Sequence, residues 1–283
     1  MRDLSRELAP ISDAAWSEIE KEAKQALKDT LAARRIVDFS GPHSWSHSAL
    51  NLGRTQGLRG GPAEGVDARL RQVQPLVELR APFELSRAEL ETAERGAADP
   101  DLGAVRKAAV QLALAEDRAV FHGYAAGGIQ GINEAATHGA LAIPEDYNDY
   151  AAVVAEALDT LRRDGISGPY GIALGLRCYT GLTKTMSRGG GFPVIQNLGR
   201  ILEGPIVWAP AVDGAVVLSV RGGDFELTVG QDISIGYLSH TADAVRLYLQ
   251  ESMTFRALSP EAAVPLVYRS SGARAAPRRR RGR

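Results

Sequence analysis

The pattern of apolar and polar positions predicts a chain in which helices and strands are interleaved. Apolar residues from Trp16 to Leu31 recur at helical spacing, and Ser12 before them can cap the start of the helix. The same spacing predicts a long helix opened by Asp99-Pro100 and ended by Gly123, and a further helix over 149–163. Because these elements show neither a regular repeat nor a βαβ order, the pattern indicates the α+β class.

Strands are predicted most clearly in the last third of the chain, where apolar and polar residues alternate over 226–237 and 244–258. Shorter strands are predicted at 74–79 and 83–85. The segment from Gly41 to Gly65 is different, because it is rich in glycine, serine, proline and histidine. It is too long for an ordinary connection and predicts a projecting loop or an extended hairpin.

Composition narrows the class of protein. With 283 residues, 45% of them hydrophobic and 24% charged, the chain can form one large or two medium globular domains. The single Cys178 excludes an intrachain disulfide framework and a cysteine-built metal site, and it fits a reducing compartment. The apolar runs are too short for a membrane span, and the charged N-terminus has no apolar signal core behind it. We therefore expect a cytoplasmic protein with no membrane partner.

The net charge of −1 conceals an asymmetry between the body and the C-terminal tail. The tail, residues 269–283, carries seven arginines and no acidic residue, so residues 1–268 alone carry −8. A basic tail on an acidic body predicts that any contact with an anionic surface or nucleic acid is made by the tail and weakens with salt. The alternative is a solvated, disordered tail without a ligand.

Candidate catalytic and metal-binding motifs are weak. His43 and His47 have the i, i+4 spacing of a helical metal pair, but the glycine, proline and serines around them favour solvated loop histidines. Glu116 and Asp117 are adjacent on a helix and point in different directions, which favours a solvated face over an acid/base pair. Gly181–Thr185 lacks the glycines of a phosphate-binding loop. We predict no catalytic residue and no metal site.

Short motifs occur in a specific order from about residue 8 to residue 267. The most informative are Arg221–Phe225, Gly230–Asp232, Ile235–Tyr237 and Ala244–Leu249. Others with matching order and spacing are Leu8–Pro10, Arg34–Asp38, Pro75–Arg80, Glu94–Gly96, Phe121–Gly123, Gly168–Tyr170 and Glu251–Phe255. Together they resemble the family 1 encapsulins, shell proteins of the linocin/bacteriocin-like family. The resemblance implies the tailed-phage major capsid protein fold of Hong Kong 97 type, with a peripheral domain, an axial domain and an extended loop.

The resemblance also implies a division of this chain. Residues 1–44 would form the N-terminal helix and the start of the peripheral domain, 45–73 the extended loop and 74–133 the peripheral domain. Residues 134–224 would form the axial domain, and 225–268 the C-terminal strands of the peripheral domain. Residues 269–283 would be an Arg-rich tail on the exterior. Strands of the extended loop without a local partner can be completed by another subunit.

Two functional surfaces follow from the resemblance. In encapsulins the N-terminal helix lines the interior and, with nearby residues, receives a short peptide at the C-terminus of cargo proteins. The candidate residues for this cargo-peptide site are Leu31, Arg34, Ile36, Asp38, Asp232, Ile233 and Ile235. The loop around the fivefold pore corresponds to Met186, Ser187, Arg188, Gly189, Gly190, Gly191 and Phe192. The alternatives are plain core or interface residues for the first set and a plain flexible loop for the second.

One cofactor is expected to be absent. Some encapsulins stack a flavin on a tryptophan in the helix that begins at Ser86, but here Ala88 stands at that position with Arg87 beside it. We therefore expect no flavin and no other cofactor.

The predicted function is structural. The chain would be the protomer of an icosahedral nanocompartment in the cytoplasm, a homo-oligomer that encapsulates a ferritin-like or peroxidase cargo through a C-terminal cargo-loading peptide. Iron storage would then be a property of the cargo. Two alternatives stay open: a protease or bacteriocin activity, which has been described for this family, and a phage major capsid protein, which shares the fold.

Overall fold

The computed structural model describes residues 4–188 and 190–269, and it contains two five-stranded sheets and a separate two-stranded hairpin. The first sheet has the order β1-β9-β11-β10, with β4 along the opposite edge of β11. Its strands are β1 (Asp38–Ser40), β4 (Val77–Ser86), β9 (Phe225–Val229), β10 (Ser234–His240) and β11 (Ala244–Ala257). The second sheet has the order β5-β12-β8-β6-β7. Its strands are β5 (Leu141–Ala142), β6 (Tyr170–Leu174), β7 (Glu203–Trp208), β8 (Ala215–Ser219) and β12 (Ala263–Val267).

The long strand β11 organises the first sheet. Its first half pairs with β10 and its second half with β9, both antiparallel, while β4 follows its other edge from Ala244 to Met253. Every residue of β11 from Leu247 to Phe255 is buried. Both faces of this strand are therefore covered. The alternation in the sequence predicts a half-buried strand, but the polar side chains in the centre of β11 are buried as well.

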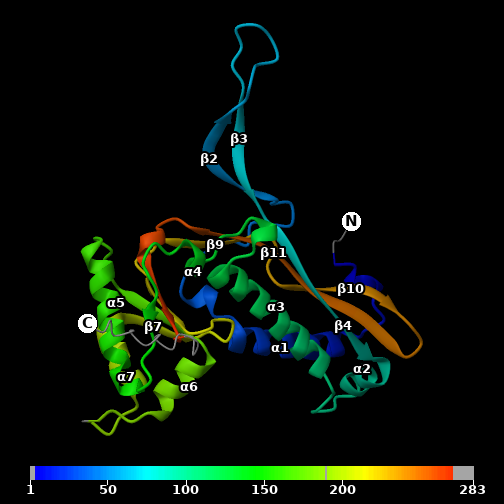
Figure 1. Ribbon diagram of the computed structural model, residues 1–283. Coiled ribbons are helices and arrows are strands. Elements are labelled where there is room, and N and C mark those ends of the chain that lie inside the picture. Colours follow the sequence, from blue (N-terminus) through cyan, green and yellow to red (C-terminus); the bar gives the residue numbers. More distant parts are fainter. Residues whose placement is uncertain (1–3, 189, 270–283) are drawn as a thin grey trace, which may run out of the picture.

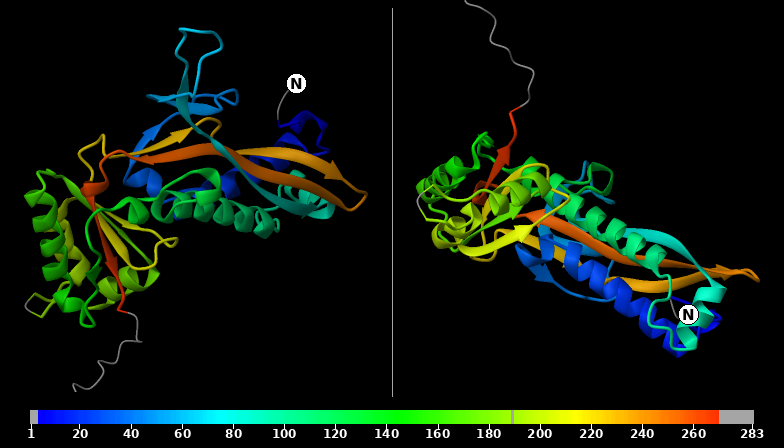
Figure 2. Two further views of the ribbon diagram at one scale, coloured as in Figure 1. Left: turned by 45° about the horizontal axis from the view of Figure 1, so that its top comes forward. Right: turned by 90° about the horizontal axis from the view of Figure 1, so that it is seen from below.

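Three helices share a hydrophobic core with the first sheet: α1 (Asp13–Thr30), α2 (Arg87–Glu94) and α3 (Gly103–His122). The helix α3 lies between α1 and strands β4 and β11, and Figure 2 shows α1 and α3 side by side along the sheet. The Ser12 hydroxyl accepts a hydrogen bond from the Ala15 amide at 3.4 Å, which confirms the predicted cap. We call this sheet with its three helices the first lobe.

The predicted start of α3 at Asp99-Pro100 is wrong. The helix begins at Gly103, whose amide donates to the Asp101 side chain at 3.0 Å. Its predicted end is confirmed, because Gly123 follows the last turn with a φ of 84°, a conformation that favours glycine.

The second sheet carries α5 (Tyr150–Arg163), α6 (Leu176–Lys184) and α7 (Val194–Leu202), and together they form the second lobe. Strands β6 and β8 are buried at every position. Helix α5 confirms the helix predicted over 149–163. The short α4 (Ile132–Ala135) follows α3 and also contacts β12.

The C-terminal strand differs from the expected division of the chain. Residues 225–268 were expected to stay together with the peripheral domain, but β12 pairs antiparallel with β8 and parallel with β5. The chain therefore leaves the first sheet after β11, and its last described strand lies in the second. The apolar run Ala263–Leu266 is buried there, and this burial accounts for the crossing.

The glycine-rich segment forms a hairpin that projects from the molecule (Figure 1). Strands β2 (Ala49–Gly57) and β3 (Arg69–Pro75) pair antiparallel and contribute to neither sheet. The apolar side chains Leu58, Val66, Leu70 and Val73 are each about half exposed on it.

In residues 4–188 and 190–269, no helix combines the length and apolar character needed to cross a membrane.

Candidate functional site

A groove with a volume of about 500 Å³ runs between α1, the N-terminal segment and the start of β10. It is lined by Leu4, Arg6, Glu20, Ala23, Lys24, Leu27, Lys28, Leu31, Arg34, Asp232, Ile233, Ser234, Ile235 and Leu249. The N-terminal segment is held in place because the Leu4 carbonyl accepts a hydrogen bond from the Tyr237 amide at 2.9 Å. Residues far apart in the sequence therefore build one site.

The walls of the groove are apolar. Leu27 comes from α1, Leu31 directly follows this helix, and Ile233 comes from the segment before β10; all three are partly exposed. Lys24 and Lys28 stand one helical turn apart on the rim. A groove of this volume with partly exposed aliphatic side chains and charges at its edge suits an extended peptide with apolar anchors.

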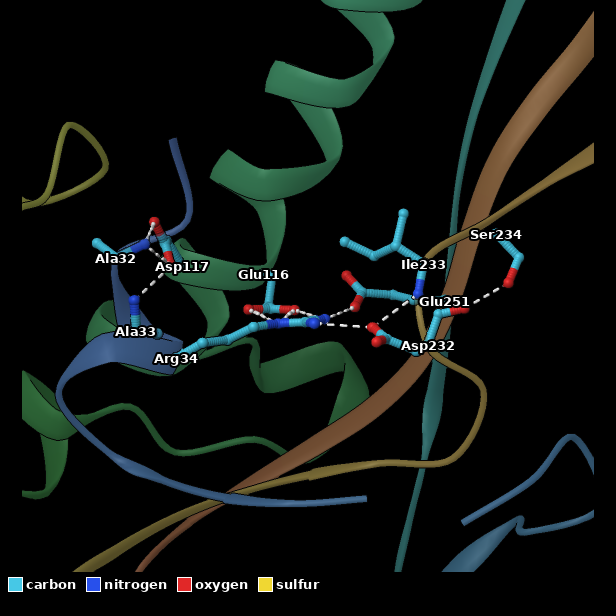
Figure 3. Close-up of polar contacts among 9 residues, drawn as sticks. All are labelled: Ala32, Ala33, Arg34, Glu116, Asp117, Asp232, Ile233, Ser234 and Glu251. Carbon is cyan, nitrogen blue, oxygen red and sulfur yellow. Dashed lines mark hydrogen bonds and ion pairs between the residues drawn. The ribbon is translucent and has the colours of Figure 1, made fainter. Parts of the chain in front are cut away.

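The floor of the groove is a charged cluster centred on Arg34 (Figure 3). The Arg34 Nη2 donates to Glu116 Oε2 at 2.6 Å and to Glu251 Oε2 at 3.0 Å, while Nη1 donates to Asp232 Oδ1 at 2.7 Å. The side chains of Glu116 and Glu251 are 0% exposed, whereas Asp232 is 45% exposed. One guanidinium therefore joins the partly exposed Asp232 to two buried carboxyl groups.

Asp117 extends the cluster away from the groove. Its carboxylate accepts hydrogen bonds from the amides of Ala32 and Ala33, at 3.0 Å and 2.8 Å, where the short 3₁₀ turn Ala33–Arg35 begins. Burial raises the pKa of Asp117 to about 7, although these two amides act in the opposite direction. Burial, followed by the proximity of Glu116, also raises the pKa of Glu251 well above its ordinary value.

The interpretation of Glu116 and Asp117 as a solvated face is wrong, because both side chains are fully buried. They do point in different directions, Glu116 toward Arg34 and Asp117 toward the amides of the 3₁₀ turn. The signal was present in the sequence. Glu116 continues the apolar spacing of Leu112 and Val120, and a carboxylate at such a position implies a buried cationic partner.

Five of the seven residues predicted for the cargo-peptide site line this groove, namely Leu31, Arg34, Asp232, Ile233 and Ile235. Ile36 and Asp38 do not, since they line a separate, smaller depression of about 180 Å³. Ile36 is buried against Gly171, and Asp38 Oδ2 accepts from the Gly223 amide at 2.6 Å. Sequence reasoning missed Lys24, Lys28 and the N-terminal Leu4 and Arg6.

The second predicted surface, residues 186–192, connects α6 and α7 at the end of the second lobe, far from the hairpin (Figure 1). The Ser187 amide donates to the Phe192 carbonyl at 2.8 Å, and Arg188 forms an ion pair with Asp146. Met186 and Phe192 are 53% and 59% exposed. Gly189 lies outside the described residues, as do residues 270–283 of the tail.

His43 and His47, which the sequence predicts to be solvated loop histidines, lie at the base of the hairpin. Their ring centroids are 4.8 Å apart, and His43 is exposed, but the Nε2 atom of His47 is buried and has no hydrogen-bond partner among the described residues. Within the described part of the chain, no three His, Cys, Asp or Glu side chains are placed to hold a metal ion.

A virus-like particle and a phage capsid are among the solved structures with a similar fold. A virus-like particle from Pyrococcus furiosus matches with a TM-score of 0.62 at 16% identity, covering 88% of this chain and 98% of that chain. The capsid of Myoviridae phage XM1 matches with a TM-score of 0.53 at 10% identity, covering 83% and 90%. The fold is therefore that of the tailed-phage major capsid proteins, as predicted.

Sequence comparison shows to which family of capsid-fold proteins the chain belongs. A family model described as "Encapsulating protein for peroxidase" matches residues 1–254. A type 1 encapsulin shell protein of Rhodospirillum rubrum is 56% identical over 271 residues, covering 94% of this chain and 96% of the relative. The corresponding protein of Mycobacterium tuberculosis is 46% identical over 266 residues, covering 94% and 99%. The chain belongs to the encapsulin family, and it is a structural shell protein rather than an enzyme.

Proposed function

We propose that this shell protein assembles into a closed icosahedral compartment in the cytoplasm and retains cargo enzymes by binding their C-terminal peptide in the groove beside α1. The observation that carries the proposal is the groove itself, where partly exposed Leu27, Leu31 and Ile233 lie above the charged floor of Arg34 and Asp232. Apolar pockets supply the binding energy of a peptide, and the charged floor fixes its register.

Two further features support assembly. Within the described residues, the two strands of the projecting hairpin pair with each other and with no further strand. The hairpin also presents several half-exposed apolar side chains, which a neighbouring subunit can cover. We also propose that the loop 186–192, in which Met186 and Phe192 are more than half exposed, surrounds a fivefold pore. For the cargo, the description of the matching family names peroxidase, and a ferritin-like protein is the second cargo class that we propose.

The Arg-rich tail is proposed to lie on the exterior and to contact anionic surfaces. Removing residues 269–283 should leave particles intact and lower only their salt-dependent binding to polyanions. Failure to assemble after this deletion would show that the tail is not a dispensable exterior segment.

The groove proposal is tested by a matched pair of substitutions. Ile233→Glu places a charge in the groove and should abolish cargo loading without dissolving the shell, because Ile233 is only partly buried. Leu238→Glu makes the same kind of change at a 43% exposed position of β10 outside the groove, and loading should stay as in the unmodified shell. Electron microscopy of particles from the native host, with mass spectrometry of their contents, measures assembly and loading together. Equal loading in the two variants would refute the groove as the cargo site.

A further inference from the structure

We propose that Glu116 and Glu251 form a proton-binding site beneath the groove, in which one shared proton holds the two carboxyl groups against Arg34 at neutral pH. The effect of this proton on cargo binding rests on the function proposed above; the proton-binding site itself does not.

The geometry brings the two carboxyl groups to a single nitrogen. Arg34 Nη2 donates to Glu116 Oε2 at 2.6 Å and to Glu251 Oε2 at 3.0 Å (Figure 3). Glu116 comes from α3 and Glu251 from β11, so the pair joins the helical layer to the sheet. Neither side chain is exposed. Water therefore cannot screen the repulsion between them.

The charges that are hydrogen-bonded to one another in this cluster do not balance, and Arg6, Lys24 and Lys28 stand farther out among the groove residues. The 3₁₀ turn contributes Arg34, α3 contributes Glu116 and Asp117, β11 contributes Glu251, and the segment before β10 contributes Asp232. Strand β1 contributes the Phe39 ring, whose centroid lies 5.1 Å from the guanidinium carbon of Arg34, while Asp38 of the same strand accepts from the Gly223 amide instead. One cation thus faces three carboxyl groups directly, with a fourth adjacent. Two like carboxyl groups in one buried site ordinarily share a proton, because both cannot ionise at acceptable free energy.

An unpaired oxygen supports the same assignment. Glu251 Oε1 is buried, and no hydrogen-bond donor from residues 4–188 or 190–269 reaches it. A buried carboxylate oxygen in this position is unfavourable, whereas a neutral carboxyl group can donate its own proton to Glu116. Burial and the nearby Glu116 both raise the pKa of Glu251, in agreement with a neutral acid.

The proton is coupled to the groove through Asp232. Its Oδ1 binds Arg34 and also accepts from the Ile233 amide at 2.8 Å, so the position of this carboxylate sets the position of one apolar wall. Loss of the shared proton adds a negative charge beneath Asp232 and repels it. We therefore expect cargo to bind less tightly as the pH rises through the alkaline range.

Infrared spectroscopy of purified shells tests the site directly, because a neutral carboxylic acid has its own carbonyl band. Spectra are taken in an Asp117→Asn background, so that Asp117 does not contribute. The band should be present at neutral pH, disappear at high pH, and be absent in both Glu251→Gln and Glu116→Gln. Glu94→Gln, at an exposed position of α2, should leave the band unchanged. A band that persists in both buried variants, or that is missing at neutral pH, would overturn the proposal.

The coupling is tested by dissociating native particles in denaturant and reassembling them with their own cargo at about pH 6 and about pH 9. Unmodified shells should load several-fold less cargo at the higher pH, while Glu251→Gln, which imitates the protonated state, should load equally at both. Equal pH dependence in shell and variant would overturn the coupling. Particles without any cargo at either pH would refute the proposed function but leave the infrared result standing.

Discussion

The two lobes contain sheets of equal strand number but bury different chemistry. In the second lobe, strands β6 and β8 are buried at every position and are almost entirely apolar. The first lobe buries Glu116, Asp117 and Glu251 beneath its groove. Asp224 is the other buried carboxyl group in residues 4–188 and 190–269; it stands directly before β9 and pairs with Arg221.

This difference indicates where function constrains the sequence. Buried ion pairs can often be replaced by apolar residues without loss of stability, so stability alone does not explain the cluster. The position of the cluster does explain it, because Arg34 and Asp232 belong both to the cluster and to the groove. Among the described residues, no charged side chain is buried in β6 or β8 of the second lobe, and these strands are packed with almost entirely apolar side chains.

The largest effect is expected at Arg34. Arg34→Met removes the cation that faces Glu116, Glu251 and Asp232, and it leaves buried carboxyl groups without their partner. Breaking a buried ion pair from one side lowers the free energy of unfolding by about 3–5 kcal/mol. Thermal and urea unfolding of purified particles measures the loss. Adding Glu116→Gln and Glu251→Gln to this variant should recover part of it, and an unchanged melting temperature in Arg34→Met would contradict a coupled cluster.

A smaller, pH-dependent effect is expected at Asp117. The folded protein binds its proton more tightly than the unfolded chain does, because burial raises the pKa of Asp117 from 3.8 to about 7. Stability from this site is therefore present at acid pH and falls as the pH rises through that interval, by at most about 4 kcal/mol. Asp117→Asn should flatten the dependence of the melting temperature on pH.

The second lobe supplies the control for this prediction. Leu158 lies in α5 with 2% of its surface exposed, and Leu158→Ala should lower the free energy of unfolding by about 2–5 kcal/mol. Because no charge changes, this loss should be the same at acid and neutral pH. If the Asp117 variant followed the pH profile of the Leu158 variant, titration of Asp117 would not control stability.

The contrast between the lobes also explains what could be predicted from the sequence. Helices α1 and α5 and the apolar strands follow from local periodicity, since each needs only a covered stripe or face. The motifs shared with encapsulins were sufficient for the fold. The cluster was missed because Arg34, Glu116, Asp232 and Glu251 are far apart in sequence, and only the folded topology brings them together. The strand β12 was misassigned for a similar reason, because its partner sheet depends on long-range pairing.

The smallest effect is expected for an exposed arginine–carboxylate pair of the second lobe. Comparing this pair with Arg34 tests whether burial causes the difference in stability between the two substitutions. Arg163 and Asp159 are one helical turn apart on α5, at 2.5 Å, with 77% and 57% of their side chains exposed. Arg163→Met should change the free energy of unfolding by no more than about 0.5 kcal/mol, because water and salt already screen the pair. The same substitution therefore removes the same functional group at two sites, 34 and 163, with expected effects that differ several-fold. Melting curves at low and high salt measure this, and a loss at Arg163 equal to that at Arg34 would mean that burial of the cluster has no energetic consequence.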